Sequence, residues 1–273
     1  MTTQANSPCL DCPAHNTANL LRLGVDMGDA DYVVALAGNP NTGKSTVFNE
    51  LTGLRQHTGN WPGKTVTRAE GAFSFGGKKY KLVDLPGTYS LLSASTDEEI
   101  ARNFILFGKP DVTIAVVDST RLERNLNLVL QILEITERVV VCLNLTDEAE
   151  RHGLKLDDRT LAKELGVRVV QTSARQGVGL NELLQAVHDV ATGAFVSRPW
   201  RIRNNHAKLE NAITELATLL EKRFTGLTNA RWVALRLLEG DQDIIEAVAS
   251  GDLANLSTNS ALPVASQPEL VVE

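Results

Sequence analysis

The sequence predicts an α/β fold, with a mostly parallel six-stranded sheet covered by helices and a small all-helical domain after it. Strand-like apolar runs alternate with helix-like stretches between residues 31 and 192, and such alternation keeps most strands parallel. From about residue 202 only helical periodicity remains. The 273 residues are 43% apolar and 22% charged, which is typical of a soluble globular protein with one large domain and an appendage.

Each element follows from a local signal. The strands are expected at Val33–Gly38, Phe73–Phe75, Tyr80–Asp84, Val112–Asp118, Val139–Asn144 and Arg168–Thr172. The helices between them are expected at Lys44–Thr52, Asp97–Phe107, Arg124–Glu137, Asp157–Leu165 and Leu180–Val190. Gly76-Gly77 links two short runs as a hairpin, so one antiparallel strand is expected at the edge of the sheet.

The C-terminal part reads as helices, and the chain divides into four parts. One apolar helix face is formed by Leu209, Ile213, Leu216, Leu220 and Phe224. Further helical signals come from Trp232, Leu235, Leu238, Ile244, Ile245 and Val248, with Gly226 and Gly240 as helix stops. The expected parts are a loosely ordered extension (1–30), the α/β domain (31–192), a helical domain (193–253) and a disordered tail (254–273).

Residues 38–45 fit the pattern G-x-x-x-x-G-K-[ST] of a phosphate-binding loop. An apolar strand precedes the loop and a helix follows it, so backbone N–H groups and the helix dipole would face the phosphates. Lys44 would add a cation there, and Ser45 would ligate Mg²⁺. The expected nucleotide contacts in this region are Asn39, Asn41, Thr42, Gly43, Lys44, Ser45 and Thr46.

Three later segments select guanine over adenine as the base. Asp84-Leu85-Pro86-Gly87 ends a strand, so Asp84 would hold Mg²⁺ through water and the Gly87 N–H would meet the γ-phosphate. Asn144 and Asp147 form an Asn-x-x-Asp pattern after another strand, where Asp147 would accept from guanine N1–H and the exocyclic amine. Ser173-Ala174-Arg175 would supply a backbone N–H to guanine O6. Each pattern is weak alone, and Asn-x-x-Asp by itself is more often a turn, but the four occur in order, each just after a strand.

Charge and cysteine usage exclude other classes. The net charge of −6 argues against nucleic acid as a partner, and no run of 18 apolar residues or secretory signal is present. Three cysteines give no even disulfide framework, which fits a reducing cytosol. Cys142 is expected to be a core residue. Cys9, Cys12 and His15 could bind Zn²⁺ or Fe²⁺, but they lack an obvious fourth ligand, and an ordinary tail is the alternative.

The motifs together resemble the cytosolic GTPase domain of FeoB, the prokaryotic ferrous-iron transporter, within a Ras-like fold. The resemblance covers about residues 32–250 and is carried by the phosphate loop, Gly59-Asn60-Trp61-Pro62-Gly63, the run from Asp84 to Leu91 and the run from Val117 to Leu126. The helical appendage ending in Leu237-Leu238-Glu239-Gly240-Asp241 is similar to the family's domain that slows GDP release.

The resemblance implies a potassium-activated GTPase that uses GTP/GDP, Mg²⁺ and K⁺. Thr88 stands where Ras-type proteins carry a water-positioning Gln, and its side chain is too short for that role. By resemblance, K⁺ would be held by the Asn41 side chain and the carbonyls of Gly59 and Trp61; for Asn41, a turn residue is the alternative. Thr65 would ligate Mg²⁺ as the first-switch threonine, with Thr67 as its competitor. Gly63 and Lys64 would also contact the nucleotide.

The resemblance also implies coupling to ferrous-iron transport at the cytoplasmic face of the inner membrane. A membrane transporter domain of the same longer polypeptide is the expected partner, and small cytosolic Feo proteins and a homo-oligomer are candidates. Leu145 departs from the usual Lys of the guanine motif, which should weaken guanine affinity. His57 is expected to be solvated. Two alternatives stay open: a soluble GTPase of ribosome assembly or tRNA modification, and a slow GTP-gated binding switch.

Overall fold

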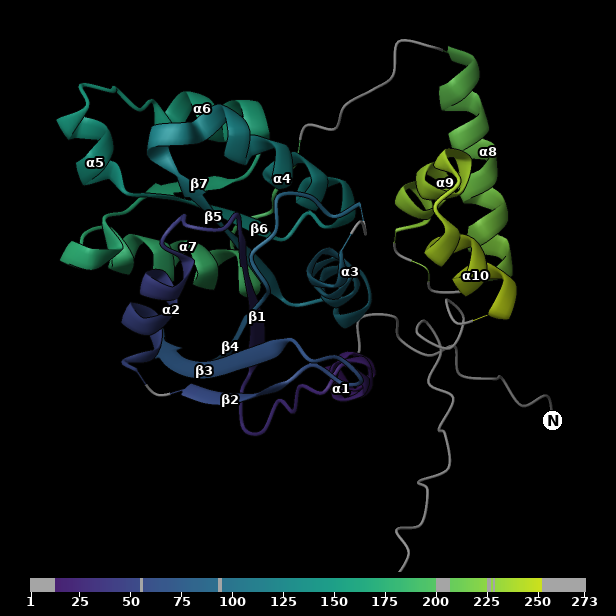
Figure 1. Cartoon of the computed structure of the whole chain (residues 1–273), viewed down its shortest axis with the longest axis horizontal. Coiled ribbons are helices and arrows are strands. Elements are labelled where there is room, and N and C mark those ends of the chain that lie inside the picture. Colours follow the sequence, from purple (N-terminus) through teal and green to yellow (C-terminus); the bar gives the residue numbers. More distant parts are fainter. Residues whose placement is uncertain are drawn as a thin grey trace, which may run out of the picture. The chain divides into compact units, whose positions relative to one another are not determined.

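The computed structural model describes residues 13–54, 56–92, 95–199, 207–224, 227 and 229–251 (Figure 1). Two compact units are distinguished, Met1–Asn211 and Ala212–Glu273. The larger unit holds the sheet and the helices that cover it. The smaller unit is helical. Among the described residues, no helix has the length and apolar character needed to cross a membrane.

The larger unit is built on one seven-stranded sheet with the strand order β2-β3-β4-β1-β5-β6-β7. The strands are β1 (Tyr32–Gly38), β2 (Gln56–Asn60), β3 (Thr67–Phe75), β4 (Lys78–Asp84), β5 (Val112–Asp118), β6 (Val139–Asn144) and β7 (Arg168–Gln171). Strands β4, β1, β5, β6 and β7 are mutually parallel, whereas β2 and β3 are antiparallel to their neighbours. The predicted mixed α/β class is therefore confirmed.

Helices cover both faces of the sheet (Figure 1). The helical elements of this unit are α1 (Pro13–Arg22), α2 (Lys44–Thr52), α3 (Thr96–Asn103), the π-helical turn η1 (Phe104–Gly108), the 3₁₀ turn η2 (Ser119–Arg121), α4 (Leu122–Ile135), α5 (Thr146–Arg151), α6 (Asp158–Leu165), the 3₁₀ turn η3 (Ala174–Gln176) and α7 (Leu180–Ala191). Val34, Leu36 and Leu82 point to the face covered by α2 and α7, and the alternate strand residues are buried on the other face. Burial on both faces explains why these strands read as continuous apolar runs.

Two expectations about the sheet were wrong. A seventh strand, β2, pairs with β3, so β3 is not at the edge of the sheet and two strand pairs, β2–β3 and β3–β4, are antiparallel. β2 reads Gln-His-Thr-Gly-Asn and all its residues are exposed, so it carries no apolar alternation for a sequence reading to detect. Strand β3 begins at Thr67, six residues before the expected start, because its first residues are polar or small.

The extension before the sheet is also more ordered than expected. Residues 13–22 form α1, and Leu20 and Val25 are fully buried. The segment contains few apolar residues, which is why its composition suggested a loose segment. Helix α5 was missed for the same reason.

Parallel pairing gathers the motifs at one edge of the sheet. Leu36 pairs with Asp84, Asp118 with Asn144, and Leu143 with Gln171. The carboxyl ends of β1, β4, β6 and β7 therefore lie side by side, and ligands of open α/β sheets bind at this edge.

The helical unit comprises α8 (Ala207–Arg223), α9 (Ala230–Glu239) and α10 (Gln242–Ser250). Ile213, Leu220 and Phe224 are buried as their spacing predicted, although Leu209 is 37% exposed. Gly240 ends α9 in the left-handed conformation, as expected of a helix stop. Gly226 and the predicted tail after residue 253 lie outside the described residues.

Candidate functional site

The loop of residues 38–45 joins the carboxyl end of β1 to the N-terminus of α2, as its motif predicted. Thr42 is buried and its hydroxyl donates to the Asn39 carbonyl at 2.9 Å. Gly43 caps α2 with φ +79°, and Asn41 also has a positive φ of 67°. The loop is thus tightly coiled, and it leads directly into the unpaired N–H groups of a helix, which bind anions. Ser45 and Thr46 lie in the first turn of α2.

Lys44 and Asp84 meet at this loop. Lys44 Nζ lies 2.5 Å from Asp84 Oδ1, and the two side chains are only 12% and 19% exposed. Burial raises the pKa of Asp84, and the charge of Lys44 opposes that rise. The structure therefore brings together the cation expected at the phosphates and the carboxylate expected near Mg²⁺.

The segment after Asp84 returns to the same loop. The Thr88 N–H donates to Gly38 O at 3.3 Å, and a Cβ placed on Gly87 would lie 3.5 Å from Pro40 Cα. The Thr88 hydroxyl donates to Ser90 O at 2.6 Å, so its hydrogen is already used within the turn. Thr88 is therefore not arranged as a water-positioning group.

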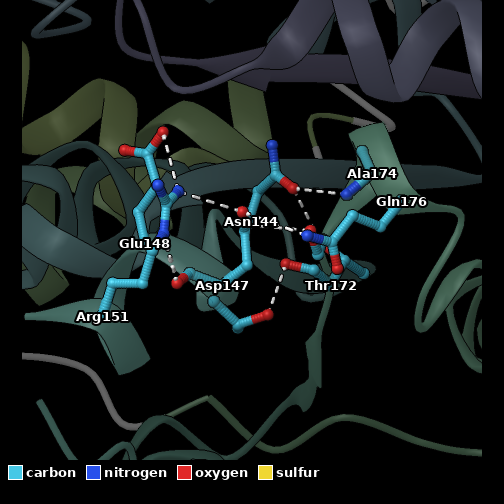
Figure 2. Close-up of polar contacts among 9 residues, drawn as sticks. Asn144, Asp147, Glu148, Arg151, Thr172, Ala174 and Gln176 are labelled. Carbon is cyan, nitrogen blue, oxygen red and sulfur yellow. Dashed lines mark hydrogen bonds and ion pairs between the residues drawn. The ribbon is translucent and has the colours of Figure 1, made fainter. Parts of the chain in front are cut away.

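Asn144 lies at the end of β6, and Figure 2 shows its side chain in contact with Thr172 and Ala174. Its Nδ2 donates to Thr42 O at 3.0 Å. Its Oδ1 accepts from the Ala174 N–H at 3.1 Å and from the Thr172 hydroxyl at 3.2 Å. The side chain is buried, so these bonds fix its position. This supports the predicted role of Asn144 as a loop support.

Asp147 stands in the first turn of α5, where Figure 2 shows it among polar neighbours. Ser173 Oγ donates to Asp147 Oδ1 at 2.9 Å, and Arg151 Nη2 lies 3.2 Å from Oδ2. The hydrogen bond from Ser173 is the main cause that lowers the pKa of Asp147. The side chain keeps 27% of its surface exposed, so an ionised acceptor remains accessible to a base.

In the third guanine segment, the backbone N–H groups of Ser173 and Ala174 are already hydrogen-bonded within the protein. The Ser173 N–H donates to Val178 O at 3.1 Å, and the Ala174 N–H is bonded to Asn144. Of the three predicted residues, Arg175 is left as the candidate O6 donor. The sequence reading missed Arg151, although its i,i+4 spacing from Asp147 is a recognisable signal. It also missed Thr172 and Gln176, for which no sequence pattern was available.

The residues predicted to hold K⁺ are not assembled in this structure. Gly59 belongs to β2 and pairs with Arg68, three strands from β1, which corresponds to about 14 Å across the sheet. The Trp61 carbonyl accepts the Lys64 N–H at 3.0 Å, and the Trp61 ring packs edge-on against Phe104 at 5.5 Å. The contacts of these residues thus run to β3, η1 and their own turn, away from Asn41.

The remaining first-switch residues lie in the same hairpin. Thr65 is exposed in the turn between β2 and β3, and Thr67 pairs with Asn60 in the sheet. Gly63 has a positive φ of 68°, and Lys64 Nζ lies 2.9 Å from Glu99 Oε2. His57 is exposed in β2, as expected.

The predicted tail site cannot be placed. Cys9 and Cys12 lie outside the described residues, and so does the side chain of His15. Within the described part of the chain, no group of three His, Cys, Asp or Glu side chains is arranged to hold a metal ion. Cys142 is fully buried in β6.

Two family models match the chain. Residues 32–187 match "Ferrous iron transport protein B", and residues 206–262 match "FeoB cytosolic helical domain". The curated relatives include an Fe(2+) transporter FeoB of Shigella flexneri, which is 41% identical over 76% of this chain. Another, from Salmonella choleraesuis, is 39% identical over 84% of this chain. This chain spans 27% and 29% of the lengths of those two proteins.

Solved structures agree with the sequence matches. The cytosolic domain of T. maritima FeoB in apo form superposes with a TM-score of 0.72 at 38% identity, over 85% of this chain and 88% of that one. The cytosolic domain of L. pneumophila FeoB gives 0.73 at 34% identity, over 82% and 88%. Because the model of ferrous iron transport protein B matches residues 32–187, more than half of the chain, the chain belongs to the ferrous iron transport protein B (FeoB) family.

Proposed function

We propose that this chain hydrolyses GTP to GDP and phosphate with Mg²⁺ and K⁺, and thereby regulates or drives ferrous-iron transport. The observation that carries the proposal is the bond of 3.0 Å between Asn144 Nδ2 and Thr42 O. It joins the phosphate loop to Asn144, which stands three residues before Asp147, the carboxylate that can read guanine. Structures of the cytosolic domain of T. maritima FeoB have been solved in GDP and GMPPNP forms, which supports nucleotide binding by this chain.

Hydrolysis would use few protein groups, because phosphoryl transfer depends mainly on positioning and charge neutralisation. Lys44 would exchange its partner Asp84 for the phosphate oxygens, and the Gly87 N–H would donate to the γ-phosphate. The Ser45 hydroxyl and the Asp84 carboxylate are the hard oxygen donors that Mg²⁺ prefers, so this donor set fits the ion. Bound Mg²⁺ would neutralise charge on the β- and γ-phosphate oxygens.

Potassium use requires a rearrangement of the β2–β3 hairpin. The residues present do not converge on a cation in the described conformation, because Gly59 is paired in the sheet and the Trp61 carbonyl is bonded to Lys64. Thr65 likewise lies in the hairpin turn. Movement of residues 56–66 toward Asn41 would bring these groups to the phosphates, where K⁺ would supply positive charge near the leaving oxygen.

Transport itself would belong to a longer polypeptide. The relatives are named as Fe(2+) transporters and this chain spans 27% of the first of them, so a membrane domain on the same polypeptide is the proposed partner. The chain would then lie at the cytoplasmic face of the membrane, with the helical unit slowing GDP release. The family match favours this role over ribosome assembly or tRNA modification.

The deciding experiment measures GTP turnover in matched K⁺ and Na⁺ buffers for the parent chain and for Asn41→Ala. Turnover should be faster in K⁺, and Asn41→Ala should remove the difference while GDP still binds. Asn181→Ala, an exposed position on α7, serves as the matched control and should behave as the parent. Equal turnover of the parent in both buffers would contradict potassium activation.

A slow GTP-gated binding switch is the second candidate. The observation in its favour is that the Thr88 hydroxyl is bonded to Ser90 O and not offered to water. Tight GTP binding with slow turnover under every cation condition would support this function instead.

A further inference from the structure

The segment before β1 precedes the region matched by the FeoB model, which begins at residue 32, yet it is part of the folded unit. It comprises α1 and the turns that follow it, up to residue 31. Leu20 and Val25 are fully buried. The segment therefore has fixed contacts with the rest of the unit, and some of them reach the β2–β3 hairpin.

Apolar packing joins α1 and Trp61 to the same turn. A Cβ placed on Gly108 of η1 would lie 3.1 Å from Leu23 Cδ1 and 3.5 Å from Leu20 Cδ2. Phe104, the first residue of η1, packs edge-on against the Trp61 ring at 5.5 Å. The N-terminal segment and the hairpin loop thus share one apolar support.

Arg68 links the hairpin to the segment directly. It is the second residue of β3, just after the loop of residues 61–66, and its Nη1 donates to Leu23 O at 3.3 Å. Its guanidinium also lies 5.5 Å from the centroid of the Trp61 ring. Its Nε is 2.7 Å from Glu70 Oε1.

The charged network continues from Arg68 back to the same segment. Glu70 Oε2 is 2.6 Å from Lys81 Nζ, and Lys81 Nζ donates to Asp26 O. The three side chains are only 11% to 20% exposed, so their hydrogen bonds are stronger than those of a surface pair. Both ends of the network rest on carbonyl groups of the N-terminal segment, those of Leu23 and Asp26.

Gly24 brings the N-terminal segment into contact with Pro62, in the loop of residues 61–66. It has φ +82°, and a Cβ at this position would lie 2.3 Å from Arg68 Nη1 and 2.8 Å from Pro62 Cγ. Beside it, the buried Trp61 Nε1 has no hydrogen-bond partner among the residues that the structure describes. An unpaired buried N–H disfavours the conformation that contains it. The neighbouring residues therefore hold the loop in this conformation, although the unpaired Trp61 Nε1 destabilises it.

We propose that residues 20–26, the N-terminal clamp, hold the loop of residues 61–66 in the hairpin through Arg68, and so limit its movement toward the phosphate loop. Arg68 is a positioning residue in this scheme. The regulatory consequence rests on the proposed GTPase function, because release of the loop would allow residues 56–66 to move and bring Thr65 and the carbonyls of Gly59 and Trp61 to the nucleotide. Loosening the clamp should then raise turnover without changing the guanine contacts.

The test uses Trp61 as the reporter in the full chain with Trp200→Phe and Trp232→Phe. In this background Gly24→Ala is compared with Gly28→Ala, whose φ of +57° carries similar strain but whose Cβ would meet nothing within 4 Å. Without nucleotide, Gly24→Ala should shift Trp61 emission to the red and increase its quenching by acrylamide, and Gly28→Ala should match the parent.

Turnover supplies the second readout. Gly24→Ala should raise GTP turnover in K⁺ by about tenfold, the factor that corresponds to loss of one charge-assisted hydrogen bond, with GDP affinity unchanged. Lys81→Met should act in the same direction without altering any backbone angle. Its control is Lys79→Met on the same strand, where the lysine is 58% exposed and pairs with Asp29.

Two outcomes would overturn the clamp. One is unchanged Trp61 emission in folded Gly24→Ala and Lys81→Met; the other is an equal change in Gly28→Ala and Lys79→Met. Failure of the proposed function is a separate result, because it appears as absent GTP turnover in the parent. The emission of Trp61 requires no nucleotide, so it reports on the clamp in either case.

Discussion

Asn144 unites the nucleotide site through one side chain. Its amide donates to Thr42 O of the phosphate loop and accepts from Ala174 and Thr172 at the end of β7. Leaving any of these buried partners unpaired would cost about 1–3 kcal/mol. Asn144 is therefore a positioning group for the whole site, and Asp147 is the group left to face a base.

The first prediction concerns Asp147→Asn. Loss of a charged acceptor should weaken GDP binding by about 10- to 150-fold. A xanthine nucleotide has an oxo group in place of the exocyclic amine, so it should bind the variant more tightly than it binds the parent. Titration with fluorescent nucleotides measures both affinities. Glu148→Gln, an exposed neighbour on α5, is the control and should bind GDP normally. Equal losses for both variants would contradict the assignment.

The second prediction is that moderately acidic pH does not change the contribution of Asp147 to GDP affinity. The hydrogen bond from Ser173 holds the pKa of Asp147 below its ordinary 3.8, so the carboxylate stays charged at any higher pH. The contribution of Asp147 to GDP affinity should be constant between about pH 8 and pH 5 and should be lost only below the lowered pKa. Comparing GDP affinity as a function of pH for the parent and for Asp147→Asn isolates this contribution. The prediction would be contradicted if the two affinities approached one another while the pH was still above about 5.

The third prediction concerns Cys142. Burial raises the pKa of its thiol to about 12, so the thiolate is scarce at neutral pH. Iodoacetamide should leave Cys142 unmodified in the folded chain and modify it after denaturation, as peptide mass spectrometry would show. Rapid labelling of native Cys142 would mean that β6 opens far more readily than its burial implies.

At the scale of elements, α2 depends on a glycine at each end for different reasons. Gly43 at its start and Gly53 at its end both have left-handed angles, φ +79° and φ +60°. A Cβ on Gly43 would lie 2.4 Å from Asn144 Nδ2, whereas a Cβ on Gly53 would meet nothing within 4 Å. The first glycine allows the close approach of two loops, and the second only ends a helix.

The fourth prediction compares Gly43→Ala with Gly53→Ala. Both should lose about 1–2 kcal/mol of stability from the left-handed backbone. Only Gly43→Ala should also displace Asn144. Loss of its hydrogen bonds to Thr42 and to Thr172 and Ala174 should reduce GDP affinity by about tenfold or more. Thermal unfolding and nucleotide titration separate the two effects. Similar affinities for both variants would show that the contact with Asn144 is dispensable.

At the scale of the molecule, the larger unit extends past the boundary expected at residue 192. The Phe195 N–H donates to Asp189 O and the Arg198 N–H to Gly166 O, each at 2.9 Å. The Arg168 guanidinium lies 4.6 Å from the centroid of the Phe195 ring. Residues 193–199 are therefore structural parts of the sheet unit.

The fifth prediction is that a chain of residues 1–199 unfolds at a higher temperature than one of residues 1–192. Loss of Phe195 burial and its stacking with Arg168 should remove about 2 kcal/mol, which corresponds to roughly 4–8 °C for a unit of this size. Circular dichroism melts of the two chains measure the difference. Identical melts would place the domain boundary where the sequence suggested it.

The sequence by itself determined the α/β class, the parallel central strands, the phosphate loop, the guanine motif and the helical unit. These features depend on short-range patterns: periodicity, and glycines and polar residues at fixed spacings after a strand. Asn144 could be assigned its support role because it is the last residue of the predicted strand β6 and begins the Asn-x-x-Asp pattern. Leu20 and the polar β2 could not be placed, because the segment around Leu20 has few apolar residues and β2 has no apolar alternation.

Only the tertiary structure decided which side chains meet. The pairing of Lys44 with Asp84, the bond from Asn144 to Thr42, and the network from Leu23 through Arg68 and Lys81 to Asp26 join segments distant in sequence. The hairpin conformation of Gly59 and Trp61 was decided in the same way. Its physical reason is that strand pairing with β3 and packing against η1 compete with contacts to the phosphate loop, and that balance is a property of the folded unit as a whole.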